Sequence, residues 1–155
     1  MAVNDRYPII PGPVAFRVVR TEGRHLHTDD GRRILDAGGG ALVANVGYGR
    51  HEVAAAAARA MARVTYVLPT WPTDARVDLV HRVIDEWMPP SITRASFTSG
   101  GSESVDTALR LARQHHLSAG RTERWRVIGR RPSYHGVTLG ALAAGGHDAR
   151  RAGFE

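Results

Sequence analysis

The stretch from residue 94 to residue 113 constrains the fold of this chain more than any other. Residues 94–98 are short and partly β-forming, two glycines follow, and apolar side chains then recur on one helical face at Val105, Ala108, Leu109 and Ala112. The order predicts a strand, a glycine turn and a helix. Such a turn exposes backbone N–H groups at the positive end of the helix dipole, which suits an anion such as phosphate.

Ser102 lies at the start of this predicted helix and has two possible uses. Its hydroxyl could bind the phosphate, or it could cap the helix, and on its own the stretch is better explained by an ordinary capped helix. The stretch is not a P-loop, because the lysine and the spacing of that motif are missing.

The rest of the chain alternates between predicted strands and helices. Residues 16–28 and 33–36 favour two strands joined by a turn at residues 28–31, and a glycine-rich loop follows. Helices are expected over residues 51–65 and from Pro72 to the stop at Pro89–Pro90, and a further short strand over residues 125–129. The alternation predicts an α/β fold with parallel strands.

Composition narrows the classes of protein. With 43% hydrophobic and 23% charged residues, the chain matches a soluble globular protein, and it has neither a membrane-length apolar run nor a signal peptide, so we expect a cytoplasmic location. Cysteine is absent, which excludes disulfides, thiolate metal sites and a cysteine nucleophile, and no metal site is predicted. All 21 basic residues are arginine, yet they are dispersed and many lie beside acids, so we do not expect a nucleic acid partner.

A second chemically distinctive segment, residues 133–136, follows the predicted strand at 125–129. Tyr134 could stack on a flat heteroaromatic cofactor at the carboxyl edge of a parallel sheet. It could equally be a core tyrosine with a hydrogen-bonded hydroxyl. His135 taken alone is more often a structural residue.

Together these segments resemble one family. Residues 97–113, FTSGGSESVDTALRLAR, resemble the phosphate-binding turn and following helix of class III pyridoxal-phosphate-dependent aminotransferases, which read close to F-x-N-S-G-S-E-A-V-E-x-A-L-K-L-A-R. Residues 30–47, 133–141 and 146–155 follow the same family in order and spacing. The resemblance implies the N-terminal half of a fold type I transferase similar to ornithine, 4-aminobutyrate and ω-amino acid aminotransferases.

The resemblance also implies roles for particular residues. Gly101 and Ser102 would hold the cofactor phosphate, Tyr134 would stack on the pyridine ring, and His135 would adjoin that site. The chain departs from the family at Ser99 and Gly100, which replace Asn-Ser and could loosen the turn.

On the substrate side, the resemblance places Trp71, Ala41 and Leu42 at the border of the pocket. Trp71 precedes Pro72 and could equally pack at a helix start. Residues 48–51 replace a His-x-His-Pro pattern, a change expected to affect packing only. We expect residues 1–50 to form an N-terminal arm and hairpin with an active-site loop, and residues 51–155 to form part of the large cofactor-binding domain.

Transamination requires a lysine that binds pyridoxal phosphate and moves a proton, and this chain has no lysine. No catalytic residue is therefore expected here, and Glu155 is not expected to be a natural end of the fold. In the favoured interpretation a separate chain, the C-terminal half, supplies the lysine and an aspartate, in a hetero-oligomer with two copies of each half.

Two alternatives remain open: a truncated fragment of a single-chain aminotransferase, and a non-catalytic module that binds a phosphate ligand. The expected substrates are an amino donor and an oxo-acid or aldehyde, which the sequence does not identify further. Decarboxylation and amino-group migration also remain open.

Overall fold

The structure is a computed structural model, and it describes residues 16–154 of the chain. The chain divides into two compact units, Met1–Ala75 and Arg76–Glu155, which are described in turn. The boundary after residue 50 that the sequence suggested stays a prediction.

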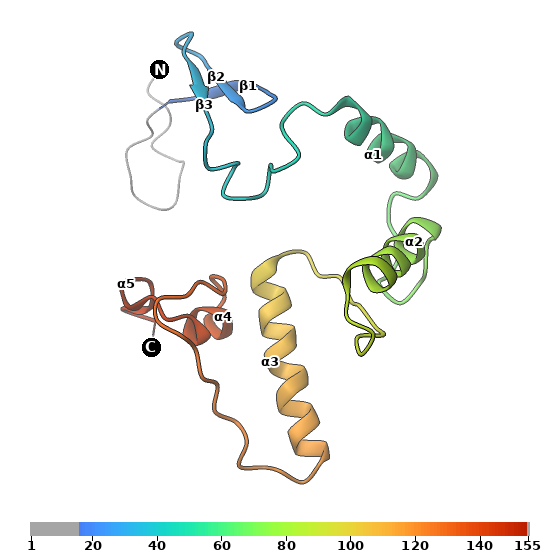
Figure 1. Cartoon of the computed structure of the whole chain (residues 1–155), viewed down its shortest axis with the longest axis vertical. Coiled ribbons are helices and arrows are strands. Elements are labelled where there is room, and N and C mark those ends of the chain that lie inside the picture. Colours follow the sequence, from blue (N-terminus) through green and yellow to red (C-terminus); the bar gives the residue numbers. More distant parts are fainter. Residues whose placement is uncertain (1–15, 155) are drawn as a thin grey trace. The chain divides into compact units, whose positions relative to one another are not determined.

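The first unit contains a small antiparallel sheet (Figure 1). Strand β1 spans Val18–Glu22, β2 spans His25–Thr28 and β3 spans Arg33–Leu35, in the spatial order β1-β2-β3. Gly23 turns the chain between β1 and β2 with a φ of 57°, a conformation that glycine adopts without steric cost. The expected pair of strands joined by a turn is confirmed.

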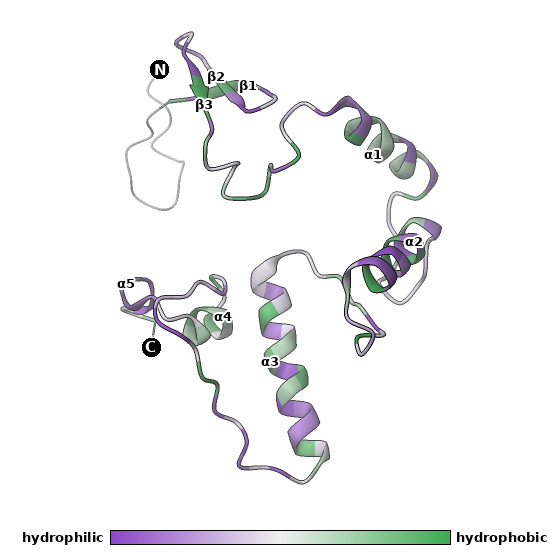
Figure 2. Cartoon of the chain, in the orientation of Figure 1, coloured by the Kyte–Doolittle hydropathy of each residue, from purple (hydrophilic) through white to green (hydrophobic). Residues whose placement is uncertain are grey.

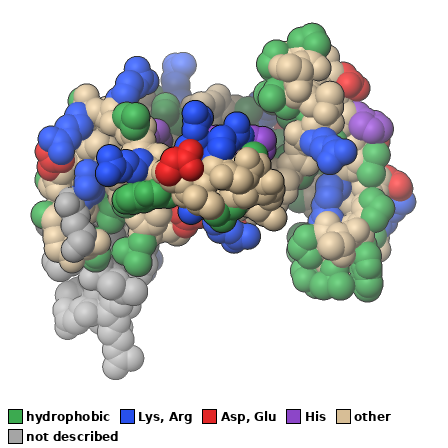
Figure 3. Space-filling model, turned by 90° about the horizontal axis from the view of Figure 1, so that it is seen from below, with side chains coloured by type: hydrophobic (Ala, Val, Ile, Leu, Met, Phe, Trp, Pro, Cys, Tyr) green, Lys and Arg blue, Asp and Glu red, His purple; other side chains and the backbone are tan. Residues whose placement is uncertain are grey.

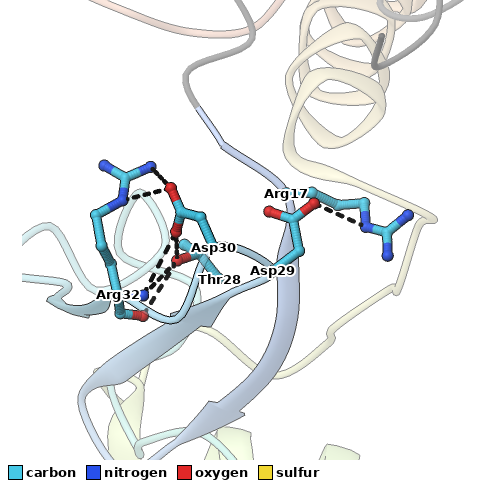
Figure 4. A network of polar contacts seen from close by, with 5 residues as sticks. All are labelled: Arg17, Thr28, Asp29, Asp30 and Arg32. Carbon is cyan, nitrogen blue, oxygen red and sulfur yellow. Dashed lines mark hydrogen bonds and ion pairs between the residues drawn. The ribbon is translucent and has the colours of Figure 1, made fainter. Parts of the chain in front are cut away.

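Polar contacts fix the turn between β2 and β3 (Figure 4). The buried Thr28 hydroxyl contacts the Asp30 carboxylate and accepts the Arg32 backbone N–H at 3.0 Å. The Arg32 guanidinium pairs with Asp30 at 2.7 Å, and this hydrogen bond, with that of Thr28, holds the pKa of the Asp30 carboxyl well below its ordinary value. The turn therefore satisfies its buried hydroxyl locally.

Two of the predicted helices follow in the chain. Helix α1 spans His51–Arg63, within the predicted range of 51–65. Helix α2 spans Asp74–Arg82 and continues as a π-helical turn, η1, over Val83–Trp87, ending just before Pro89. Both helix predictions are confirmed, because proline and alanine act on the backbone locally.

The second unit contains α3 (Gly101–Ser118), α4 (Leu139–Ala144) and α5 (Asp148–Arg151). Helix α3 is the predicted helix after the glycine turn. Helix α4 packs against α3, and Ala141 of α4 is fully buried. The packing fixes the segment that carries Tyr134 relative to the start of α3.

The predicted parallel strands differ from what the structure shows. Residues 94–98 and 125–129 carry neither helix nor strand and pair with no strand among residues 16–154. Figure 1 shows the second of them as an extended run between α3 and α4. A strand is stabilised by hydrogen bonds to a neighbour, so β-forming side chains alone leave the chain extended but unpaired.

Hydrophobic side chains are widely exposed in the described part of the chain. Ala141 is its one buried hydrophobic residue, while Ile128 is 96% and Val43 85% exposed. Figures 2 and 3 show apolar residues on the helices and on the drawn face. Over residues 16–154 no helix is both long and apolar enough to cross a membrane.

Candidate functional site

The turn before α3 is open on the side where an anion would bind. Gly100 precedes the helix with an extended backbone, and no side chain caps it. A β-carbon added at Gly100 or Gly101 would meet nothing within 4 Å. The first N–H groups of a helix have no intrahelical acceptor, and within residues 16–154 those of Gly101 and Ser102 have none elsewhere.

The residues beside these N–H groups hold the turn in shape. The Glu103 carboxylate accepts the Ser99 backbone N–H at 2.8 Å, and the hydroxyls of Thr98 and Ser104 lie 2.5 Å apart. Substitution of Asn-Ser by Ser99 and Gly100 was expected to loosen the turn. The hydrogen bond from the Ser99 N–H to Glu103 holds the turn closed with these residues in place.

Ser102 links the turn to a distant segment instead of capping the helix. Its Oγ accepts the Val137 backbone N–H at 3.0 Å. Gly136 is buried with a φ of 139°, and a β-carbon there would lie 2.8 Å from the Ser102 Cα. Only glycine fits this close approach. The Ser102 hydroxyl keeps its own proton free to donate to a ligand.

Tyr134 lies two residues before Gly136, in the segment that Ser102 holds. It is 61% exposed in the described part of the chain, and its stacking role stays a prediction. The Arg150 guanidinium lies 5.0 Å from the ring centroid, a cation–π distance. Sequence reasoning gave Arg150 no role, and nothing in residue spacing could have paired it with Tyr134.

His135 is exposed, and its role stays a prediction. The structure thus brings Gly101, Ser102 and the 134–136 segment together within one unit. In the described part of the chain, no group of three or more histidines, cysteines or carboxylates could hold a metal ion.

The predicted substrate-side residues lie in the first unit. Ala41 and Leu42 have positive φ values of 58° and 71°, which non-glycine residues rarely adopt. Leu42 is 78% exposed and borders a hollow of about 300 Å³. Trp71 is 58% exposed, and its backbone N–H donates to Leu68 at 2.9 Å shortly before α2 begins.

A carboxylate organises the loop that holds Ala41 and Leu42. The Tyr48 hydroxyl donates to the Asp36 Oδ2 at 2.6 Å. This hydrogen bond, followed by those from the glycine N–H groups of the loop, lowers the pKa of Asp36 despite partial desolvation, and it raises the pKa of Tyr48. The expectation that the change at residues 48–51 affects packing only was incomplete, because Tyr48 also hydrogen-bonds.

Comparison with known proteins decides the family. Residues 10–155 match the family model described as aminotransferase class III. The chain belongs to the class III aminotransferases. The cofactor that this membership implies is pyridoxal phosphate, and the resemblance, fold class and cofactor predicted from the sequence are confirmed.

Curated relatives and solved structures agree with this assignment. The chain is 40% identical over 140 residues to a probable aminotransferase of Mycobacterium tuberculosis, covering 89% of this chain and 30% of the relative. A putrescine–pyruvate aminotransferase of Pseudomonas aeruginosa is 34% identical, with 85% and 29% covered. The chain thus spans about 30% of the length of the curated relatives that it matches.

Two solved structures show the same fold. An (S)-enantioselective ω-transaminase from Thermomicrobium roseum superimposes with a TM-score of 0.85 at 34% identity, covering 98% of this chain and 35% of that one. An amine transaminase from an uncultivated Pseudomonas species, in its PLP-bound form, also has a TM-score of 0.85, at 29% identity, with 95% and 35% covered.

Proposed function

We propose that this chain supplies the phosphate-binding turn and the ring-stacking tyrosine of a pyridoxal-phosphate-dependent aminotransferase, while a second chain supplies the lysine. The open glycine turn at the start of α3, within a chain of this family, carries the proposal. The assembled enzyme moves an amino group from an amino donor to an oxo-acid or aldehyde.

The residues of the turn fit a phosphate dianion. The N–H groups of Gly101 and Ser102 lie at the positive end of an 18-residue helix, where negative charge is stabilised. The Ser102 hydroxyl donates to the phosphate while its oxygen accepts from Val137. A single side chain thereby couples the phosphate to the Tyr134 segment.

Tyr134 orients the cofactor ring. Its exposed side chain offers an aromatic face for stacking, and Arg150 lies against the same ring. When bound, pyridoxal phosphate serves as an electron sink for the substrate amine. The residues of this chain bind and orient it, and none of them is assigned a proton-transfer step.

A second chain that corresponds to the remaining C-terminal part of the family supplies the lysine and the aspartate. Two observations support it: no lysine is present among the 155 residues, and large apolar side chains are exposed, as at Ile128 and Val43. Apolar exposure on this scale marks surface that further polypeptide covers, here assigned to the second chain. The family resemblance adds the expected stoichiometry, a hetero-oligomer with two copies of each chain.

Co-expression with a candidate C-terminal half tests the proposal. The tagged chain should capture that half, and the complex should transfer an amino group from 1-phenylethylamine to pyruvate only when both chains and pyridoxal phosphate are present. Replacing the candidate lysine of the second chain with alanine serves as the matched inactive control.

The two alternative interpretations are other outcomes of this experiment. Activity that appears only when the two halves are fused into one polypeptide would identify a fragment of a single-chain enzyme. A chain that stays monomeric and inactive with every candidate half, yet binds phosphate ligands, would identify a binding module.

A further inference from the structure

The loop between β3 and α1 is organised around the Asp36 carboxylate. Its Oδ2 accepts the Gly40 backbone N–H at 2.7 Å and the Tyr48 hydroxyl at 2.6 Å. Its Oδ1 accepts the Gly38 backbone N–H at 3.1 Å. Hydrogen bonds to an ionised carboxylate are about twice as strong as neutral ones, so this carboxylate holds both ends of a tight loop.

Tyr48 connects that carboxylate to the sheet. Its backbone N–H donates to Gly23 at 2.7 Å, and its carbonyl accepts the Gly23 N–H at 3.0 Å, at the turn between β1 and β2. The main chain of Tyr48 is therefore fixed, and its hydroxyl reaches back 12 residues to Asp36. This contact ties Tyr48 to the start of the loop, whose backbone is also held by hydrogen bonds from Leu42 to Gly38 at 3.1 Å and from Ala44 to Gly39 at 2.8 Å.

The loop also contains Ala41 and Leu42, whose backbone conformation is unusual. Ala41 and Leu42 have φ values of 58° and 71°, and such backbone persists only where surrounding contacts impose it. Gly40 lies directly before them, and a β-carbon at Gly40 would lie 2.8 Å from the Tyr48 hydroxyl. Tyr48 thus packs on the backbone that leads into the strained pair.

Leu42 and this hydrogen-bonded pair also share a surface. Leu42, Asp36 and Tyr48 all line the hollow of about 300 Å³. Leu42 is 78% exposed, so its position depends on the backbone of the loop and not on side-chain packing.

We propose that the hydrogen bond from Tyr48 to Asp36 is a positioning device that sets the Ala41–Leu42 backbone and thereby the amine preference of the substrate pocket. The proposal rests on the proposed function, with Leu42 assigned to that pocket by the family resemblance. Tyr48 and Asp36 act through the loop and are not catalytic residues.

The test uses Tyr48→Phe in the co-purified two-chain complex, with Tyr66→Phe as the matched control, since Tyr66 is 74% exposed in the same unit. The first readout is hydrogen exchange of the Gly40 amide, whose N–H donates a hydrogen bond to the Asp36 carboxylate. Loss of a hydrogen bond to a charged group should speed this exchange at least about tenfold in Tyr48→Phe and leave it unchanged in Tyr66→Phe.

The second readout is the KM for two amines of different size, isopropylamine and 1-phenylethylamine. We expect Tyr48→Phe to change the ratio of the two KM values at least about threefold with kcat nearly unchanged, because ground-state binding is altered and the chemical step is not. Asp36→Asn, which preserves the size of the side chain, should reproduce both effects and replaces Tyr48→Phe if that variant does not fold.

The outcomes separate this inference from the proposed function. Unchanged Gly40 exchange in both variants overturns the positioning role, whatever the activity. Faster exchange with an unchanged KM ratio overturns the link to the substrate pocket. A wild-type complex that transaminates neither amine counts against the proposed function, while the exchange measurement still decides the positioning role.

Discussion

Gly136→Ala is the substitution whose effect the structure specifies most closely. The backbone at Gly136 has a φ of 139°, a region that is nearly restricted to glycine and costs other residues about 1–3 kcal/mol. The new methyl would also lie 2.8 Å from both the Cα and the Cβ of Ser102. Relieving such overpacking costs about 1–3 kcal/mol. We therefore expect a total loss of about 2–6 kcal/mol.

Urea unfolding of the complex measures this loss, and Gly120→Ala is the matched control. Gly120 also has a positive φ, 72°, but a β-carbon there meets nothing within 4 Å, so only the backbone term of about 1 kcal/mol applies. Gly136→Ala should also weaken binding of pyridoxal phosphate, because it pushes the Tyr134 segment away from the turn. If Gly136→Ala costs no more than Gly120→Ala and leaves cofactor affinity unchanged, the close contact with Ser102 does not hold this segment.

Three further predictions follow from the site and the loop. Ser102→Ala removes the acceptor of the Val137 N–H and a donor to the phosphate, so it should cost about 1 kcal/mol of stability and lower cofactor affinity about tenfold or more, as measured by urea unfolding and absorbance titration. Tyr134→Ala should weaken cofactor binding in the complex and Tyr134→Phe should not, since stacking needs the ring; full affinity and activity in Tyr134→Ala would contradict the stacking role. The lowered pKa of Asp36 means that its contribution to stability is present above its ordinary pKa of 3.8 and is lost as the pH falls through the lower folded value. The urea midpoint of the wild type should therefore fall more than that of Asp36→Asn between about pH 5 and pH 2, and parallel curves for the two proteins would show that the carboxylate is not held.

Local backbone preferences made much of the fold predictable. Alanine over residues 51–63 and the prolines at 72 and 89 set the helices, and Gly31 marked the turn between β2 and β3. Local backbone preferences did not correctly predict the parallel strands. Residues 125–129 have β-forming side chains, but a strand also requires a neighbour, which the described residues do not provide.

The candidate site was predictable where it is contiguous in the sequence. Gly101 and Ser102 were identified because turn and helix adjoin, and the family motif covers them. Ser102 and Val137 are 35 residues apart in the sequence, and Tyr48 and Asp36 are 12 apart. Helix and strand periodicity predicts no contact at such sequence separations. Arg150 was missed for the same reason, because its contact with Tyr134 depends on the chain path through α4 and α5.

The central claim is that this chain binds the phosphate and ring of pyridoxal phosphate while a second chain provides the lysine. Absorbance titration of the purified complex with pyridoxal phosphate tests it most directly, with the Ser102→Ala, Tyr134→Ala double variant and each separate chain titrated in parallel. The account predicts a saturable shift of the absorbance band of pyridoxal phosphate in the complex, a much weaker affinity in the double variant and no shift with this chain alone. A complex that gives no shift, or a double variant that titrates like the wild type, would contradict it.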